Sequence, residues 1–153
     1  MASNHFAEQP TSLAEQVIVM KQYFPNFVTR WHKNVICWIG EIQPSEISLS
    51  YRIKIIHQLH RVPEVIVLKP QLVADADSRI PHTYPGNRLC LYHPKKREWS
   101  QQQHVATTIV PWTALWLYYY ELWKATGEWL GEGDHPELRR SARSPIQTVL
   151  DAL

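Results

Sequence analysis

The chain has 153 residues, of which 44% are hydrophobic, and its 16 basic and 14 acidic residues leave a formal net charge of +2. This size and composition predict one compact domain with its own core, and the balanced charge argues against nucleic acid as a partner. The N-terminus has no basic region followed by an apolar run, and no apolar stretch approaches the roughly 20 residues that span a bilayer, so we expect a cytoplasmic protein without a membrane partner.

The first predicted helix covers about residues 13–23. Ser12 is expected to cap its N-terminus, and Glu15, three residues later, completes a capping-box pattern. Pro25 follows the helix and is expected to stop it.

Strands are expected to follow this helix, at residues 27–31, 35–42, 47–55 and 65–68. The third has the clearest alternation in the chain, which predicts one face on a core and one in water. Its core-facing residues should be Ile47, Leu49, Tyr51, Ile53 and Ile55. Strands that follow one another so closely predict an antiparallel meander.

The alternation is lost between residues 69 and 100, where four prolines occur. A compact domain rarely holds about thirty irregular residues without a functional reason, so we expect the functional residues in this segment. A second helix is expected to begin near Pro111 and to end at Gly127. Its apolar and aromatic stripe should pack on the sheet rather than bind a cofactor. The stripe consists of Trp112, Leu115, Trp116, Tyr119, Leu122 and Trp123, and Tyr118 and Tyr120 lie off it.

The two cysteines are too few for a disulfide scaffold or a four-ligand zinc site. Cys37 lies in a predicted strand and is expected in the core. Cys90 lies in the irregular segment, after a turn, and is predicted to be a nucleophile. A thiolate attacks carbonyl groups well near neutral pH, and the resulting thioester still reacts with amines. The alternative for Cys90 is a small buried hydrophobic residue.

We expect neither a metal nor a cofactor. A zinc site built on Cys90 and His93 would lack a second pair of ligands at a standard spacing. A carboxylate could deprotonate an attacking amine, but the sequence does not position any of the candidates, which are Glu98, Asp75 and Asp77.

The segment around Cys90 resembles the active-site segment of ubiquitin-conjugating enzymes. In that family a His-Pro-Asn tripeptide precedes a glycine, an apolar residue, the catalytic cysteine and a leucine, and Trp-Ser follows. The matching residues are His82, Gly86, Leu89, Cys90, Leu91, Trp99 and Ser100. The resemblance implies an α+β fold with an N-terminal helix, a four-stranded antiparallel meander, a long active-site loop and C-terminal helices. It implies a catalytic domain at residues 12–133, an N-terminal tail at 1–11, and a tail or terminal helix at 134–153.

The closer resemblance is to conjugating-enzyme-like proteins encoded in bacterial antiphage operons of the type II CBASS kind. It rests on Pro81-His82, Leu89-Cys90-Leu91-Tyr92, Glu98-Trp99, Thr108-Ile109-Val110-Pro111-Trp112-Thr113 and Thr126-Gly127-Glu128-Trp129. The resemblance implies that Cys90 carries the C-terminus of a cGAS/DncV-like nucleotidyltransferase as a thioester. It further implies transfer of that C-terminus to a target amine, which primes antiphage cyclic-nucleotide signalling. The activated donor would have to come from a separate protein.

One departure from the ubiquitin-conjugating pattern concerns the oxyanion donor. Thr83 and Tyr84 stand where that family has Pro-Asn, and losing one preorganised donor typically slows acyl transfer by roughly a hundredfold to a thousandfold. His82 ranks first as a substitute, and Tyr84 or a backbone amide near Cys90 are the others. Two further hypotheses stay open: an inactive conjugating-fold module that scaffolds the synthase, and a Cys-His hydrolase that removes conjugates.

Overall fold

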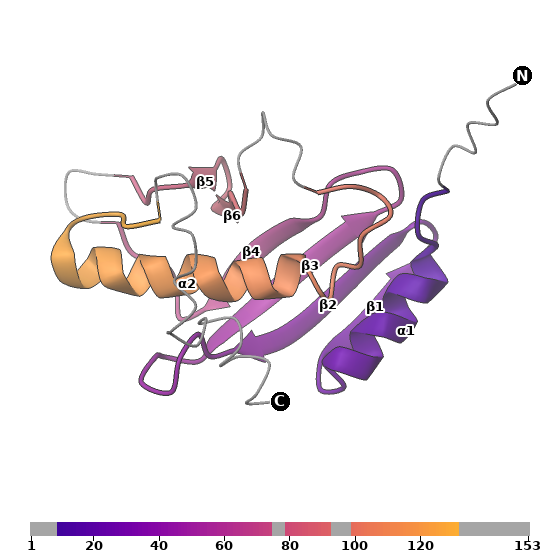
Figure 1. Cartoon of the computed structure of the whole chain (residues 1–153), viewed down its shortest axis with the longest axis horizontal. Coiled ribbons are helices and arrows are strands. Elements are labelled where there is room, and N and C mark those ends of the chain that lie inside the picture. The colour runs from indigo at the N-terminus through magenta and orange to yellow at the C-terminus, as the bar shows by residue number, and fades with distance from the viewer. Residues whose placement is uncertain (1–8, 75–78, 93–98, 132–153) are drawn as a thin grey trace, which may run out of the picture.

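The computed structural model describes residues 9–74, 79–92 and 99–131. Its elements in chain order are α1 (Leu13–Tyr23), β1 (Val28–His32), β2 (Val35–Ile42), β3 (Tyr51–Gln58), β4 (Glu64–Lys69), β5 (Thr83–Tyr84), β6 (Arg88–Leu89) and α2 (Ile109–Thr126). Two helices and an antiparallel sheet make the chain an α+β protein, as predicted. Figure 1 shows α2 crossing the sheet and α1 at the β1 end of it.

The boundaries of α1 follow the local signals in the sequence. The Ser12 side chain accepts a hydrogen bond from the Glu15 N–H at 3.1 Å, which satisfies one of the free donors of the first turn. The Glu15 carboxylate instead pairs with His104 Nε2 at 2.7 Å, and so connects α1 to the segment before α2. Gln16 adds to this connection, because its side chain bonds the Gln103 carbonyl and the Val105 N–H, both at 2.9 Å.

The sheet has six strands in the order β1-β2-β3-β4-β6-β5. The first four pair with their chain neighbours in antiparallel register. The last two arise within the segment that was expected to be irregular, so that part of the prediction was wrong. Gly86 (φ 81°) and Asn87 (φ 57°) adopt the left-handed backbone that lets the chain reverse, and Arg88 then pairs with Ile66 of β4.

The alternating pattern before β3 also misled the prediction, because β3 begins at Tyr51. Ile47 is 98% exposed and Leu49 62% exposed, so neither side chain faces the core. Local bonds hold this segment in a turn: the Ser48 N–H donates to the Ser45 carbonyl at 3.1 Å. The Leu49 N–H donates to the Glu121 carboxylate at 3.1 Å, and a main chain held by such bonds does not extend the sheet.

One hydrophobic core lies between the helices and the inner face of the sheet. The buried face of α2 differs from the predicted stripe: Trp116 and Trp123 are buried, but the other four residues of the stripe are only half-buried. Tyr120, predicted to lie off the stripe, is only 7% exposed, and its hydroxyl accepts the Val73 N–H at 2.9 Å. Tyr120 is therefore part of the core, while Tyr118 is half-buried. Gly127 (φ 79°) ends α2, as predicted, and its N–H bonds the Trp123 carbonyl.

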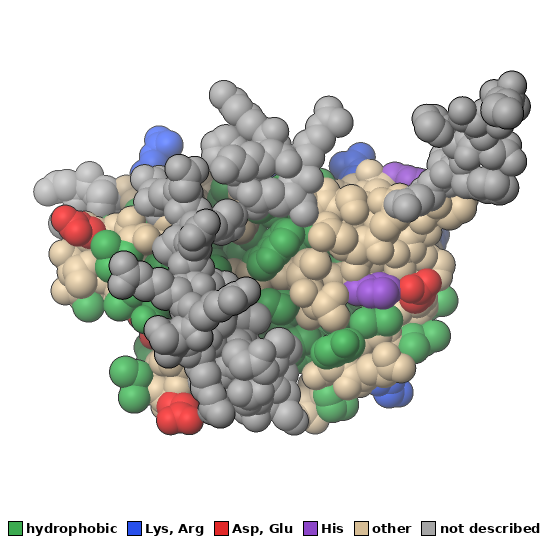
Figure 2. All heavy atoms as spheres, viewed as in Figure 1, with side chains coloured by type: hydrophobic (Ala, Val, Ile, Leu, Met, Phe, Trp, Pro, Cys, Tyr) green, Lys and Arg blue, Asp and Glu red, His purple; other side chains and the backbone are tan. Residues whose placement is uncertain are grey.

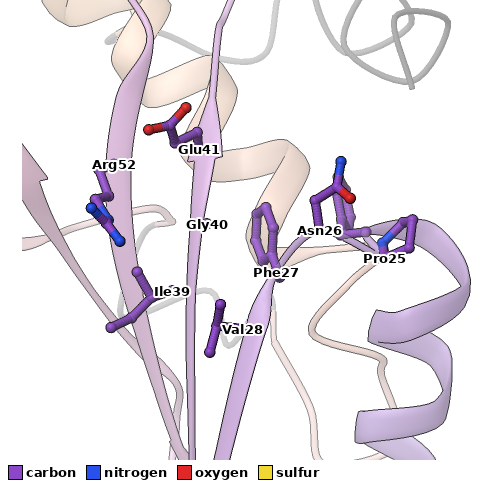
Figure 3. A pocket seen from close by; sticks show the side chains of 9 residues that line it. Pro25, Asn26, Phe27, Val28, Ile39, Gly40, Glu41 and Arg52 are labelled. Carbon is purple, nitrogen blue, oxygen red and sulfur yellow. The ribbon is translucent and has the colours of Figure 1, made fainter.

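The Phe27 ring, just before β1, packs closely against the backbone of Gly40 in β2. A Cβ at this position would overlap the Phe27 ring, so only glycine leaves room for that ring. Figure 3 shows Phe27 beside the Gly40 backbone, in a pocket of about 340 Å³ that Arg52 and Glu41 also line.

On the face of the molecule that Figure 2 shows, the Lys and Arg side chains stand apart from one another. Within residues 9–74, 79–92 and 99–131, neither helix is long and apolar enough to cross a membrane.

Candidate active site around Cys90

Cys90 follows directly after β6, and the β5–β6 hairpin sets its position (Figure 1). The pairs Thr83↔Leu89 and Tyr84↔Arg88 bring the two short strands together. The Cys90 N–H then donates to the His82 carbonyl at 2.9 Å, which extends the hairpin by one more bond. Cys90 is a free cysteine and is half-buried. The hairpin therefore holds its main chain while part of the residue remains open to solvent.

Two oxygen atoms flank the Cys90 sulfur. Sγ lies 3.4 Å from the Tyr84 hydroxyl and 3.3 Å from the Tyr92 carbonyl oxygen. The thiol has a single proton and the carbonyl can only accept, so a thiol directed at Tyr92 leaves the Tyr84 O–H able to donate to sulfur. The same phenol can donate to a thiolate.

The Tyr84 phenol stays protonated at neutral pH. Its contact with the Cys90 side chain raises the pKa of Tyr84 to about 12, and partial burial adds to this effect. The hydroxyl therefore remains a hydrogen-bond donor across the physiological range. The Tyr84 side chain is 41% exposed, so a substrate bound at the thiol could also reach it.

Arg88 connects the hairpin to β4 from the exposed side. Its guanidinium pairs with the Glu64 carboxylate at 2.6 Å and donates to the Pro85 carbonyl at 3.1 Å. It also lies 6.0 Å from the centre of the Tyr84 ring. These contacts hold the turn and place a positive charge near the phenol, although an exposed ion pair adds little to stability.

His82 contacts Cys90 through its main chain. Its carbonyl accepts both the Cys90 N–H and the Trp116 Nε1–H, the latter at 3.1 Å. Its imidazole ring packs against Trp129, with 4.9 Å between the ring centres. The backbone of His82 is left-handed (φ 51°), which turns the chain into the hairpin.

The other predicted residues are dispersed. Cys37 is half-buried on the sheet face opposite Ile36 and Trp38, so its assignment to the core was wrong: alternate residues of β2 point to opposite faces. His93, Glu98, Asp75 and Asp77 fall outside the described residues, as do residues 1–8 and 132–153 of the two predicted tails. The described residues contain no group of three side chains able to hold a metal.

Sequence reasoning missed several residues that support the thiol. They are Arg88 and Glu64 on neighbouring strands and Trp116 and Trp129 beneath the hairpin. Gly86 and Asn87 between two short β-prone segments were a usable hairpin signal. No local pattern indicates that Trp116 would meet His82, which lies 34 positions away.

The pocket in Figure 3 is not part of this site. Residues of β1, β2 and β3 and the end of α1 line it, at the opposite edge of the sheet from the hairpin. The chemistry of the thiol is therefore set by the hairpin surface and not by that pocket.

Comparison with known proteins gives one family. A family model described as type II CBASS E2 protein matches residues 16–136, a range that includes the hairpin, Cys90 and all of α2. No curated protein matches the chain.

Proposed function

Because this chain belongs to the family of type II CBASS E2 proteins, we propose that it is a conjugating enzyme whose nucleophile is Cys90. Membership places the chain in CBASS antiphage defence. The observation that carries the proposal is the free, half-buried thiol with its sulfur 3.4 Å from the neutral Tyr84 hydroxyl. We also propose that the α+β arrangement is the conjugating-enzyme fold, with β5 and β6 presenting the cysteine.

The first chemical step forms a thioester. The Cys90 thiolate attacks the carbonyl carbon of an activated C-terminal carboxyl group, which we assign to a cGAS/DncV-like nucleotidyltransferase. A carbon–sulfur bond forms, and the bond to the activating group breaks, with that group leaving together with its electron pair. A separate protein supplies the activated donor.

The second step is aminolysis. An amine of the target protein attacks the thioester carbonyl, the carbon–nitrogen bond forms and the carbon–sulfur bond breaks. The thiolate is regenerated, and the proton from nitrogen passes to a base or to water. Both steps place negative charge on the carbonyl oxygen, which a preorganised donor stabilises.

We propose the Tyr84 hydroxyl as that donor. A phenol keeps its proton at neutral pH, and the Tyr84 oxygen already lies beside the sulfur to which the acyl group would be attached. His82 is the second candidate, since its main chain is bonded to Cys90. The packing of its ring on Trp129 favours Tyr84 over His82.

The decisive experiment is intact mass spectrometry of the protein co-expressed with its CBASS neighbours. We expect an adduct on Cys90 that a reducing thiol removes, and a reductant-resistant ester in Cys90→Ser. Cys37→Ser is the matched control, because Cys37 lies on the far face of β2 and should leave the adduct intact.

The competing function is a binding module that scaffolds the synthase. Cys90→Ala separates the two: loss of both conjugation and phage defence supports the enzyme. If Cys90→Ala gives full phage defence and the wild type carries no adduct, the protein is a scaffold instead. Removal of pre-formed conjugates by the wild-type chain alone would indicate the hydrolase.

A further inference from the structure

The His82 carbonyl is a junction between the hairpin and α2. It accepts one hydrogen bond from the Cys90 N–H at 2.9 Å and another from the Trp116 Nε1–H at 3.1 Å. A carbonyl oxygen has two lone pairs, so both bonds can exist at once. The His82 carbonyl oxygen therefore links Cys90 to α2.

We propose that Trp116 is a positioning residue for Cys90: its indole N–H fixes the His82 peptide, and through it the thiol, relative to α2. This inference rests on the proposed function of Cys90. Trp116 does not touch the sulfur in the described contacts, so its effect passes through the His82 main chain.

The main-chain bonds between the hairpin and the rest of the sheet are few, so the bond to the indole adds to them. The pairing with β4 is limited to Ile66↔Arg88, the Arg88–Glu64 ion pair is exposed, and the Leu89 side chain, 5% exposed, anchors β6 in the core. Strands this short are marginal without further packing. The bond to the indole comes from the interior, where competing water is scarce and a lost hydrogen bond is least easily replaced.

Trp116 is itself well fixed. Its side chain is only 4% exposed and stacks on Tyr120, with ring centres 5.7 Å apart and planes inclined by 10°. The hydroxyl of Tyr120 accepts the Val73 N–H, which holds that ring in turn. The indole N–H therefore has a defined direction, as a positioning group requires.

Trp129 packs against both residues of the same junction. Its ring lies 4.9 Å from the His82 imidazole and 5.2 Å from the Trp116 ring, measured between centres. Trp129 follows the end of α2, where Gly127 turns the chain back. His82 is thus held by its carbonyl and by its ring, and its carbonyl in turn binds the Cys90 N–H.

Position matters here because the thiol works with a neighbour. Acyl transfer is sensitive to misplacement of about 1 Å, and a shift of that size would take the Cys90 Sγ and the Tyr84 hydroxyl, now 3.4 Å apart, out of hydrogen-bonding range. A hairpin released from α2 would hold the thiol and the phenol in register for less of the time.

The test uses Trp116→Phe, which removes the N–H donor and keeps an aromatic ring. Trp123→Phe is the matched control, because Trp123 is also on α2 and is 5% exposed. Its ring lies 6.0 Å from the Tyr120 ring between centres, with the planes tilted by 43°, and it does not reach the hairpin in the described contacts. Trp129→Leu is the second variant, since a half-buried site tolerates change better than a buried one. Thermal unfolding of all three identifies any variant that fails to fold.

Two readouts distinguish positioning from general stabilisation. Amide hydrogen exchange at Cys90 should become about fivefold faster in Trp116→Phe, the change that loss of one neutral hydrogen bond produces. The kcat for thioester formation should fall by a similar factor with KM for the donor unchanged. Trp129→Leu should shift both in the same direction, and Trp123→Phe neither.

Equal exchange at Cys90 and equal kcat in Trp116→Phe and the wild type would overturn the inference. An equal loss of kcat in Trp123→Phe would also overturn it, because the loss in Trp116→Phe would then reflect general destabilisation of the protein and not the position of Cys90. Failure of the proposed function looks different: the wild type itself would form no thioester, whereas the exchange experiment on Cys90 would still test the junction.

Discussion

His57 should make the stability of this protein depend on pH, and His57→Phe should remove that dependence. The side chain is 1% exposed on the core face of β3, and its Nδ1 has no hydrogen-bond partner among the described residues. Its ring meets Trp99 edge-on, 5.7 Å between centres. Burial lowers the pKa of His57 from 6.5 to about 4, because a charged imidazole loses its hydration there.

The sign and size follow from proton linkage. The unfolded chain binds a proton at His57 below about pH 6.5, whereas the folded protein does so only near pH 4. Stability is therefore fully present above pH 6.5 and falls as the pH drops towards 4. The full difference corresponds to about 3 kcal/mol. We expect about 2 kcal/mol, because partial solvation and local relaxation weaken the penalty on the charged ring.

The assay is urea unfolding of the wild type and His57→Phe at about pH 7.5 and about pH 4.5. Phenylalanine keeps an aromatic edge against Trp99 but cannot titrate. The free energy of unfolding of the wild type should fall by about 2 kcal/mol more than that of the variant over this range. His32→Gln, at an exposed position of β1, is the control and should follow the wild type. Parallel pH profiles for the wild type and His57→Phe would refute the reasoning.

Three other substitutions test the site and the fold. Tyr84→Phe should slow aminolysis of the Cys90 thioester by about a hundredfold in a single-turnover discharge assay, while leaving the melting temperature near that of the wild type; an unchanged rate would exclude the phenol as oxyanion donor. Gly40→Ala should lower the free energy of unfolding, measured in urea, by about 1–3 kcal/mol, because the new methyl group displaces the Phe27 ring. In a chain that also carries Phe27→Ala, the same substitution should leave the free energy of unfolding nearly unchanged. Ser12→Ala should lower it by about 1 kcal/mol through loss of the N-cap bond, and no change would mean that water replaces that bond.

Elements with complete local signals were predictable. α1 has its cap at Ser12 and covers the predicted residues, and β2 covers residues 35–42 as expected. The boundaries of both elements depend on residues close in sequence, so a local sequence pattern can predict them. Residues 47–50 show the limit of such patterns: they alternate as a strand does, yet side-chain and turn bonds hold them outside the sheet.

The α+β class was predictable from the sequence, as was the place of Cys90 after a glycine-containing turn in a proline-rich segment, because both follow from local features. Which groups meet that thiol depends on how distant parts of the chain pack together. The Tyr84 hydroxyl reaches the sulfur because the chain reverses at Gly86 and Asn87, and the His82 carbonyl joins Cys90 to Trp116 across 34 positions of sequence. Contacts of this kind depend on how α2 packs over the hairpin, and no local periodicity encodes that packing.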